Sequence, residues 1–226
     1  MNILPDGYVG FAIDKAYRSD NEASAIITTA CLDRIPYRIV QKPTDVQDNE
    51  IAVGNIKFIQ KVLGKIVTPN YYPEYLDSFL KRKTWFTNEW PLGKKVFIKP
   101  SDEYKRFTGF ITNGGYKGKK RGPYVCSEVI KITNEWRYYV CNGIVLCAGW
   151  YAGTNDVEVP APPLDVTFNK DLCACVDMGT LENGELVLIE QQHAFACGWY
   201  GKMTPFSIRL YAQWIAYGWD YTKRTT

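Results

Sequence analysis

The chain has 226 residues, of which 46% are hydrophobic and 15% aromatic, and its 27 basic and 24 acidic side chains leave a net charge of +3. This length and composition are typical of an ordered globular protein with one large domain or two small lobes. The small charge excess argues against wholesale binding of a phosphate backbone, and nowhere do about 18 uncharged apolar residues run together as a membrane span requires.

The seven cysteines include no CxxC pair, and several stand inside apolar runs. We interpret them as reduced thiols of a cytoplasmic protein, because disulfides persist mainly in oxidising compartments. Cys173, Cys175 and Cys197 form a CxC pair with one distant thiol, a weak spacing for zinc, so we expect them in the core. Residues 1–7 have neither the basic nor the apolar region of a signal peptide.

The N-terminal segment predicts part of a small α/β lobe. Ser19 and Glu22 have the spacing of a capping box, and apolar residues follow them at helical intervals. Pro36 ends this helix, and residues 37–40 then have the composition of a strand. Helix and strand in such close succession are typical of an α/β unit.

A second helix is expected over residues 56–63, and Gly64 ends it. The proline-bearing stretch 67–73 follows and marks a lobe boundary. We therefore expect an N-terminal lobe over residues 1–68 and a second region over residues 69–226.

Strands dominate the second region after one helix over residues 73–83. We expect them at residues 96–99, 107–112, 124–132, 136–140 and 144–150. The dipeptides Asn142-Gly143 and Asn183-Gly184 favour tight turns, which join neighbouring antiparallel strands. The predicted fold class is therefore α+β with a largely antiparallel sheet.

The last helix has signals at both ends. Thr204 is a good N-cap before Pro205 at the first helical position, and Gly218 is expected to end the helix. Apolar residues between these positions share one face.

The hairpin around Asn183-Gly184 carries acidic side chains on both arms. If these two residues alone form the turn, the register places Asp177 directly opposite Glu190. Gln192 then lies on the same face, because side chains alternate along a strand. Nearer the turn, this register puts Leu181, Leu186 and Leu188 on one face and Met178, Val187 and Ile189 on the other.

Two opposed carboxylates on a covered hairpin repel each other and desolvate poorly. A divalent ion held by carboxylate oxygens and by the amide oxygen of Gln192 would compensate their charge. A bulge that shifts the register, or a solvated position at the sheet edge, would remove the need for an ion. Spacing alone leaves these alternatives open.

Basic residues precede this hairpin in two groups. Lys99 ends the apolar strand 96–99, where a lysine commonly extends to water. The glycine-rich loop 113–122 contains Lys117, Lys119, Lys120 and Arg121. Glycines let a backbone approach phosphate closely and lysines neutralise it, so this loop is a phosphate cover, a solvated turn or a docking patch for RNA.

Arg137 lies on a strand rich in aromatic residues. A buried arginine needs an anionic partner, which a phosphate or a carboxylate substrate would supply. A salt bridge to Glu135 or Glu158 is the alternative.

Taken in chain order, these segments resemble the ATP-grasp superfamily, which includes D-alanine:D-alanine ligase and the ribosomal-protein glutamate ligases. Lys99 in VFIKP is similar to the strand lysine that holds ATP phosphates, and residues 126–130 resemble the hinge whose backbone pairs with adenine. The resemblance also assigns Glu135 to the ribose. It thus implies nucleotide contacts from Lys99, Glu128, Val129, Ile130 and Glu135.

Further positions match the family downstream. Arg137 in EWRYYV is similar to the arginine of the glutamate-ligase branch that faces the reacting phosphate. The family's magnesium ligands are normally an acid followed downstream by Glu-x-Asn, so the resemblance implies a metal site of Asp177, Glu190 and Gln192. Gln192 replaces the usual asparagine, which sets its oxygen one methylene further out.

The resemblance covers roughly residues 56–201 and is greatest to short ATP-grasp proteins of phages and bacteria that carry a KxFTG segment. The usual glycine-rich loop after the strand lysine is absent, so we expect Lys105, Arg106 or the later glycine-rich loop to cover the phosphates. Arg82 is another candidate anion ligand, although an exposed position on a helix is the first expectation for it. His193 either contacts substrate or is structural.

The resemblance implies an ATP- and Mg²⁺-dependent ligase that phosphorylates a carboxylate to an acylphosphate and joins it to an amine, with Lys99, Lys105 and Arg137 as catalytic residues. The two substrates would belong to amino acids, peptides or nucleotide-linked compounds. Residues 1–55 are too short for the usual preceding domain and are candidates for further substrate contacts. A phage-encoded chain would act in the host cytoplasm, and no membrane partner is expected.

Two other functions stay open at this point. One is phosphotransfer to a hydroxyl or a phosphate through the same ATP site. The other, which is not favoured, is a nucleotide-gated module that binds RNA through Lys117, Lys119, Lys120 and Arg121.

Overall fold

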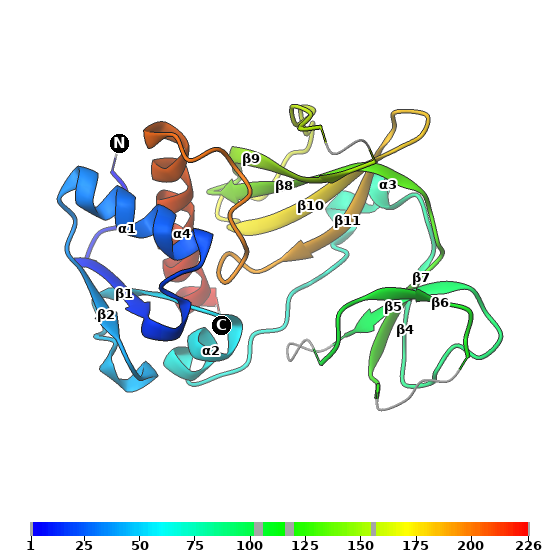
Figure 1. The fold of residues 1–226 in the computed structure, drawn as a ribbon, viewed down its shortest axis with the longest axis horizontal. Helices are drawn as coiled ribbons and strands as arrows, with labels where there is room; N and C mark the ends of the chain where they lie inside the picture. The colour runs from blue at the N-terminus through cyan, green and yellow to red at the C-terminus, as the bar shows by residue number, and fades with distance from the viewer. Residues whose placement is uncertain (1, 102–105, 116–119, 155–156, 226) are drawn as a thin grey trace.

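Three small sheets organise the chain, and the structure, a computed structural model, describes residues 2–101, 106–115, 120–154 and 157–225. The strand orders are β2-β1-β3 in the N-terminal lobe, β11-β10-β8-β9 in a central sheet and β4-β7-β5-β6 in a third sheet. Figure 1 shows the N-terminal lobe at one end and the third sheet below the far end of the central sheet. The predicted α+β class, with largely antiparallel sheets in the second region, is confirmed.

The N-terminal lobe is built on a parallel sheet. Its elements are β1 (Gly10–Asp14), η1 (Lys15–Tyr17), α1 (Asn21–Asp33), β2 (Tyr37–Val40), η2 (Pro43–Asp45), β3 (Glu50–Val53) and α2 (Ile56–Leu63). β1 lies between β2 and β3 and is parallel to both, which explains why its residues are buried along their whole length.

The two predicted helices of this lobe are present, but one of their ends differs. Gly64 caps α2 in the left-handed conformation, as predicted. The capping box of Ser19 and Glu22 is wrong, because α1 begins at Asn21 and its N-cap is Asp20, which makes no side-chain capping bond.

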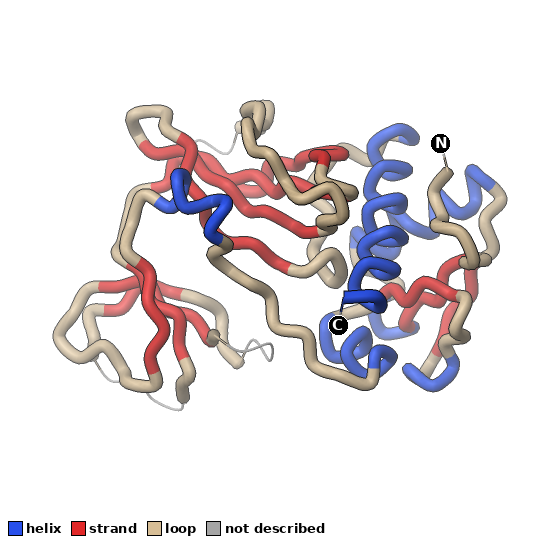
Figure 2. Tube along the Cα trace, turned by 180° about the vertical axis from the view of Figure 1, so that it is seen from behind, coloured by secondary structure: helices blue, strands red, loops and turns tan. Residues whose placement is uncertain are grey.

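Two antiparallel sheets and a long helix make up the second region. Its elements are η3 (Glu74–Leu76), α3 (Asp77–Leu80), β4 (Thr84–Thr87), β5 (Val96–Pro100), β6 (Phe110–Thr112), β7 (Tyr124–Ser127), β8 (Ile132–Cys141), β9 (Ile144–Gly153), β10 (Ala174–Leu181), β11 (Leu186–Gln192) and α4 (Pro205–Thr225). Figure 2 shows from behind that the third sheet is joined to the central sheet only at one end.

Some predicted elements of this region are shorter than expected. The helix predicted over residues 73–83 ends early, because Lys81 takes a left-handed backbone (φ 50°) directly after α3 and the chain then enters β4. The strand predicted over residues 124–132 is divided, since residues 128–131 carry the chain from the third sheet to the central sheet. Only Phe110–Thr112 of the predicted strand 107–112 is extended.

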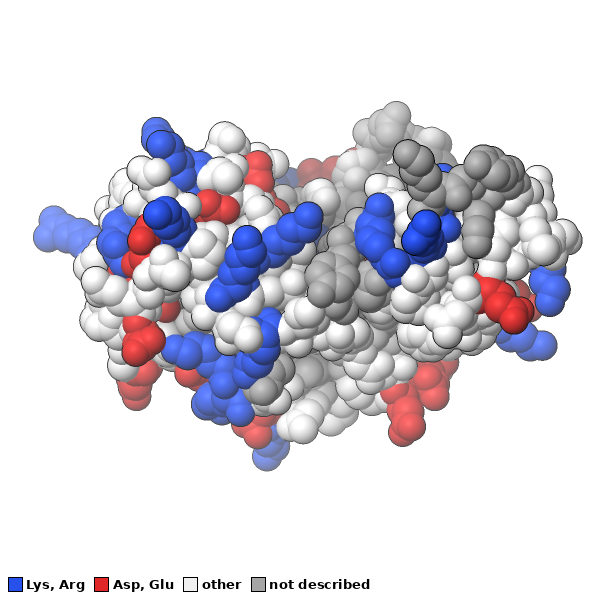
Figure 3. All heavy atoms as spheres, turned by 90° about the horizontal axis from the view of Figure 1, so that it is seen from below, with Lys and Arg blue, Asp and Glu red and all other residues white. Residues whose placement is uncertain are grey.

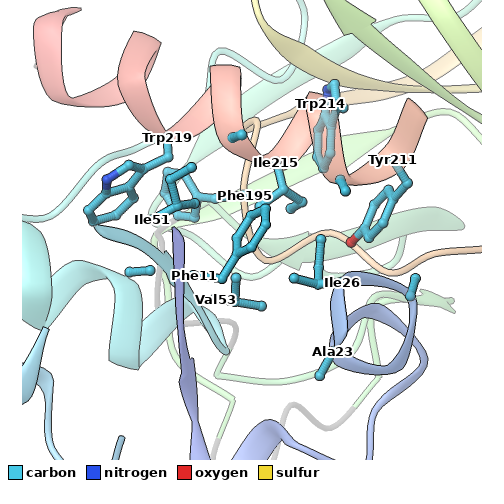
Figure 4. Close-up of a cluster of buried hydrophobic side chains, with 14 of the residues drawn as sticks. Phe11, Ala23, Ile26, Ile51, Val53, Phe195, Tyr211, Trp214, Ile215 and Trp219 are labelled. Carbon is cyan, nitrogen blue, oxygen red and sulfur yellow. The ribbon is translucent and has the colours of Figure 1, made fainter. Parts of the chain in front are cut away.

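Helix α4 completes the core of the N-terminal lobe. Figure 4 shows side chains of β1, α1, β3 and α4 meeting in one cluster, with Trp214 and Trp219 on α4. The indole N–H of Trp214 also donates to the carbonyls of Val140 and Ala174, at 3.0 and 3.1 Å, which ties the helix to β8 and β10. One core therefore draws on both sides of the boundary we expected at residue 68.

The predicted start of α4 is confirmed and the predicted end is wrong. Thr204 Oγ1 accepts a hydrogen bond from the backbone N–H of Ser207 at 3.2 Å, as an N-cap does. Gly218 lies inside the helix, where a Cβ would come within 2.4 Å of the carbonyl oxygen of Ala194. The glycine therefore serves close packing against the segment after β11 and does not terminate the helix.

The cysteines follow the expectation of reduced thiols. All seven are thiols, and Cys173, Cys175 and Cys197 are buried. Among the described residues, no group of three or more His, Cys, Asp or Glu side chains could hold a metal ion by itself. None of the helices in the described ranges combines the length and the apolarity that crossing a bilayer needs.

Replacing Trp214 with alanine should lower the free energy of unfolding by about 3–5 kcal/mol, because the substitution leaves a cavity in a packed core. Urea unfolding followed by circular dichroism measures this loss. Phe206→Ala on the same helix is the control, and since its side chain is exposed its effect should stay within about 0.5 kcal/mol. Equal effects of the two substitutions would contradict the packing described.

Candidate active site

A cavity of about 540 Å³ lies between the central sheet and the third sheet. Its apolar lining comes from Tyr72, Phe97, Ile111, Val129, Ile130, Ile132 and Ile189. Its charged lining comes from Arg82, Lys99, Glu128, Glu135, Arg137, Asp177 and Glu190. The strand lysine, the residues that cross between the sheets and the acidic hairpin therefore meet in one cleft.

Asp177 and Glu190 are opposite each other, as predicted, but the hairpin reaches this register by a different route. The turn is longer than two residues, because the backbone N–H of Leu181 bonds to the carbonyl of Glu185 at 2.9 Å. A β-bulge at Ile189 then adds one residue to β11. The bulge cancels the shift caused by the turn and restores the pairing of the two acids.

The longer turn overturns the predicted faces beside it. Met178 pairs with Leu188 and shares one buried cluster with Leu186 and Leu188. A shift of one residue moves a side chain to the opposite face of a strand. Met178 therefore lies on the face that we had assigned to the leucines.

Each carboxylate has a side-chain cation as its partner. Arg137 donates from Nε and Nη2 to the two carboxylate oxygens of Asp177 at 2.8 and 2.7 Å. Lys99 forms an ion pair with Glu190, and its Nζ lies 3.8 Å from the ring centroid of Tyr71. The charge compensation that we had expected from a bound ion is provided here by two residues of the chain.

Arg137 is held in a buried, aromatic environment. Its guanidinium carbon lies 5.8 Å from the ring centroid of Tyr151 and 5.1 Å from that of Tyr200. Burial alone would lower the pKa of Arg137, but the adjacent Cys175 and Asp177 raise it, so that the net pKa lies above the ordinary value. The guanidinium therefore stays charged inside the cleft.

The two alternative partners of Arg137 are elsewhere. Glu158 pairs with Lys202 at 3.6 Å, so the predicted salt bridge from Glu158 to Arg137 is wrong. Glu135 lines the cleft beside Tyr151, and burial, reinforced by neighbouring carboxylates that include Glu135, raises the pKa of the Tyr151 phenol.

The segment that crosses between the sheets has a fixed position. The backbone N–H of Lys83 donates to Oε2 of Glu128 at 3.0 Å, and the backbone N–H of Glu128 donates to the carbonyl of Lys83 at 3.0 Å. Val129 and Ile130 follow and line the cleft. All three residues expected in the hinge thus lie where the two sheets meet.

Gln192 and His193 lie at the far end of β11. The amide nitrogen of Gln192 donates to Glu190, which places the two side chains together as predicted. Both residues line a different cavity, of about 200 Å³. The ring of His193 stacks on Phe195 with centroids 4.6 Å apart, an arrangement that favours its structural role.

Several predicted basic residues are not brought into the cleft. Lys105, Lys117 and Lys119 lie outside the described residues. Lys120 and Arg121 line a separate cavity of about 270 Å³ with Arg106 and Phe107. On the face shown in Figure 3, basic side chains occur on both lobes and acidic ones lie among them, so the visible part of the described chain presents no continuous basic surface.

Arg82 is the main residue that sequence reasoning misplaced. It follows α3 instead of standing exposed on a helix, and it is half-buried in the wall of the cleft. Its Nη2 donates to the carbonyl of Ile189 at 2.9 Å, and its Nη1 donates to the carbonyl of Leu188. The segment Leu80-Lys81-Arg82-Lys83 has no periodicity that could have marked one basic residue as buried.

Two antiparallel sheets that enclose a charged cleft define the ATP-grasp class of proteins. Residues 79–206 match a family of ATP-grasp domains, the second family of its clade. Because the match covers more than half of the chain, the chain belongs to this family. No curated protein sequence matches it significantly.

Solved structures show the same fold at low sequence identity. A RimK domain protein ATP-grasp from Sphaerobacter thermophilus has a TM-score of 0.57 at 10% identity, covering 92% of this chain and 98% of its own. D-cycloserine synthetase DcsG has a TM-score of 0.54 at 12% identity, covering 91% and 98%. D-alanine–D-alanine ligase from Bacillus anthracis, complexed with ATP, has a TM-score of 0.51 at 10% identity, covering 95% and 97%.

Arg137→Met should lower the free energy of unfolding by about 3–5 kcal/mol, because it leaves Asp177 buried without its partner. Urea unfolding of the protein without ligands measures the loss. Lys131→Met is the matched control, since it breaks an exposed pair with Glu182 whose loss should cost at most about 1 kcal/mol. If the double variant Arg137→Met/Asp177→Leu were no more stable than Arg137→Met alone, the unpaired carboxylate would not be the cause.

Proposed function

We propose that this chain is an ATP- and Mg²⁺-dependent ligase that activates a carboxylate as an acylphosphate and joins it to an amine. The observation that carries the proposal is the row of four charged groups in the cleft, in which Lys99 pairs with Glu190 and Arg137 with Asp177. The family match and the ligase and synthetase folds of its structural neighbours support the same reaction class.

The lining of the cleft suits a nucleotide. Apolar side chains such as Phe97, Ile111 and Ile132 offer a site for a flat base, and the backbone of Val129 lies at the same wall. Glu135 can accept hydrogen bonds from ribose hydroxyls. Lys99 offers a point charge for the phosphates at the charged end of the cleft.

The residues at the charged end also fit a magnesium ion. Asp177 and Glu190 offer carboxylate oxygens, and Gln192 supports Glu190 from the adjacent position on the same face. Within the described ranges no cluster of acidic, histidine or cysteine side chains is large enough to hold an ion alone, so nucleotide phosphates would complete the coordination. When bound, the ion would neutralise charge on the phosphates.

The chemistry then follows from positioning and charge. An oxygen of the substrate carboxylate attacks the γ-phosphorus of ATP, and the bond to the bridging oxygen breaks to release ADP. The amine attacks the acylphosphate carbon, phosphate leaves, and the amine loses a proton. Arg137, buried and charged beside Asp177, would stabilise the negative charge of the transferring phosphoryl group.

ATP turnover should therefore require a carboxylate and an amine together, and hydroxylamine should trap the activated carboxylate as a hydroxamate. A screen of amino acids and short peptides, read by ADP and phosphate release, tests this directly. Lys99→Met and Glu190→Gln should lower kcat/KM by at least about 100-fold, whereas the exposed Lys131→Met should not. ADP formation with a hydroxyl acceptor and no hydroxamate would establish phosphotransfer instead and contradict ligation.

Divalent metal should bind weakly without nucleotide, because Lys99 and Arg137 already neutralise the two carboxylates. In Mn²⁺ titrations followed by electron paramagnetic resonance, adding a non-hydrolysable ATP analogue should raise the Mn²⁺ affinity by at least about 10-fold. Lys99→Met should bind Mn²⁺ without nucleotide more tightly than the wild type does. Tight Mn²⁺ binding by the wild type alone would contradict this competition.

A further inference from the structure

The bulge at Ile189 decides which side chain of β11 faces Asp177. Leu188 pairs with Met178 and is buried on one face, whereas Ile189 and Glu190 both line the cleft on the other face. With the observed turn and no extra residue, Ile189 would stand opposite Asp177 and Glu190 would point away from the cleft. The charged site thus depends on this irregularity being held in place.

Arg82 contacts the bulge directly. Its guanidinium donates to the carbonyls of Leu188 and Ile189, the last regular residue and the extra residue, and also to the carbonyl of Leu80 at 3.2 Å. β11 is the edge strand of its sheet, where carbonyls lack a further strand as partner. The fork of Arg82 supplies donors at the point where the ladder is irregular.

The surroundings keep this guanidinium in one place. It lies 5.9 Å from the ring centroid of Tyr72, and burial lowers its pKa, which the neighbouring Tyr72 partly opposes. Next along the same edge, the backbone N–H of Gln191 donates to the carbonyl of Tyr71 at 2.9 Å. The segment before α3 and the arginine after it therefore cover the edge of β11 on both sides of Glu190.

We propose that Arg82 is a positioning residue that fixes the bulge at Ile189 and thereby keeps Glu190 opposite Asp177. This inference rests on the proposed function of the two carboxylates. It differs from a role of Arg82 as a direct ligand of the nucleotide, and the two roles lead to different results.

Arg82→Met in the full chain tests the positioning first without any ligand. Hydrogen exchange of the amides of residues 189–191 should become at least about 10-fold faster, because the bulge loses its donors. Arg106→Met is the matched control, since Arg106 donates to the carbonyl of Gly122 outside the hairpin. Unchanged exchange at residues 189–191 would overturn the proposal, whether or not the protein binds ATP.

A second measurement separates the metal site from the nucleotide site. In the presence of a non-hydrolysable ATP analogue, Arg82→Met should weaken Mn²⁺ binding by about 10–100-fold, the usual range for the loss of a supporting partner. Its affinity for the analogue without metal should stay close to that of the wild type. A loss of analogue affinity as large as the loss of Mn²⁺ affinity would assign Arg82 to the nucleotide and overturn the proposal.

Deleting Ile189 provides a rescue. The deletion joins Glu190 directly to Leu188, which puts Glu190 opposite Asp177 on the cleft side without a bulge. Arg82→Met should then have little effect on Mn²⁺ affinity in the deletion background, and a full effect there would contradict the proposal. If the deletion variant does not fold, the exchange rates of Arg82→Met in the full chain decide the question.

Discussion

Two ion pairs on neighbouring strands of one sheet are the constraint on which the site depends. Asp177 on β10 and Glu190 on β11 stand opposite each other, and Arg137 and Lys99 approach them from β8 and β5. Four charges of alternating sign in a half-buried cleft are tolerable only while each keeps its partner. A nucleotide with its metal ion can replace these partnerships as a unit, whereas a lone cation or a lone anion cannot.

The architecture around the pairs follows from this requirement. Lys99 belongs to the third sheet and the other three charged residues belong to the central sheet, so the Lys99–Glu190 pair bridges the two sheets across the cleft. The short crossing at residues 128–131 connects the sheets in the chain. Helix α4 joins the N-terminal lobe to the opposite end of the central sheet, away from this crossing.

Sequence patterns located the strands, the turns and the opposition of Asp177 and Glu190, because apolar alternation and Asn-Gly turns are local signals. They missed the longer turn and the bulge, which compensate each other, since neither has a signature apart from tertiary packing. The partner of Arg137 was also out of reach. Asp177 is distant in sequence, whereas Glu135 and Glu158 were the nearer acids. Arg82 illustrates the same limit, because only the tertiary fold gives it buried carbonyls to bind.

A crystal structure with a non-hydrolysable ATP analogue and Mn²⁺ tests the central claim most directly. Anomalous scattering should place the manganese between the carboxylates of Asp177 and Glu190, with Lys99 turned from Glu190 toward the phosphates. A nucleotide bound elsewhere, with the pairs Lys99–Glu190 and Arg137–Asp177 both intact, would contradict the account.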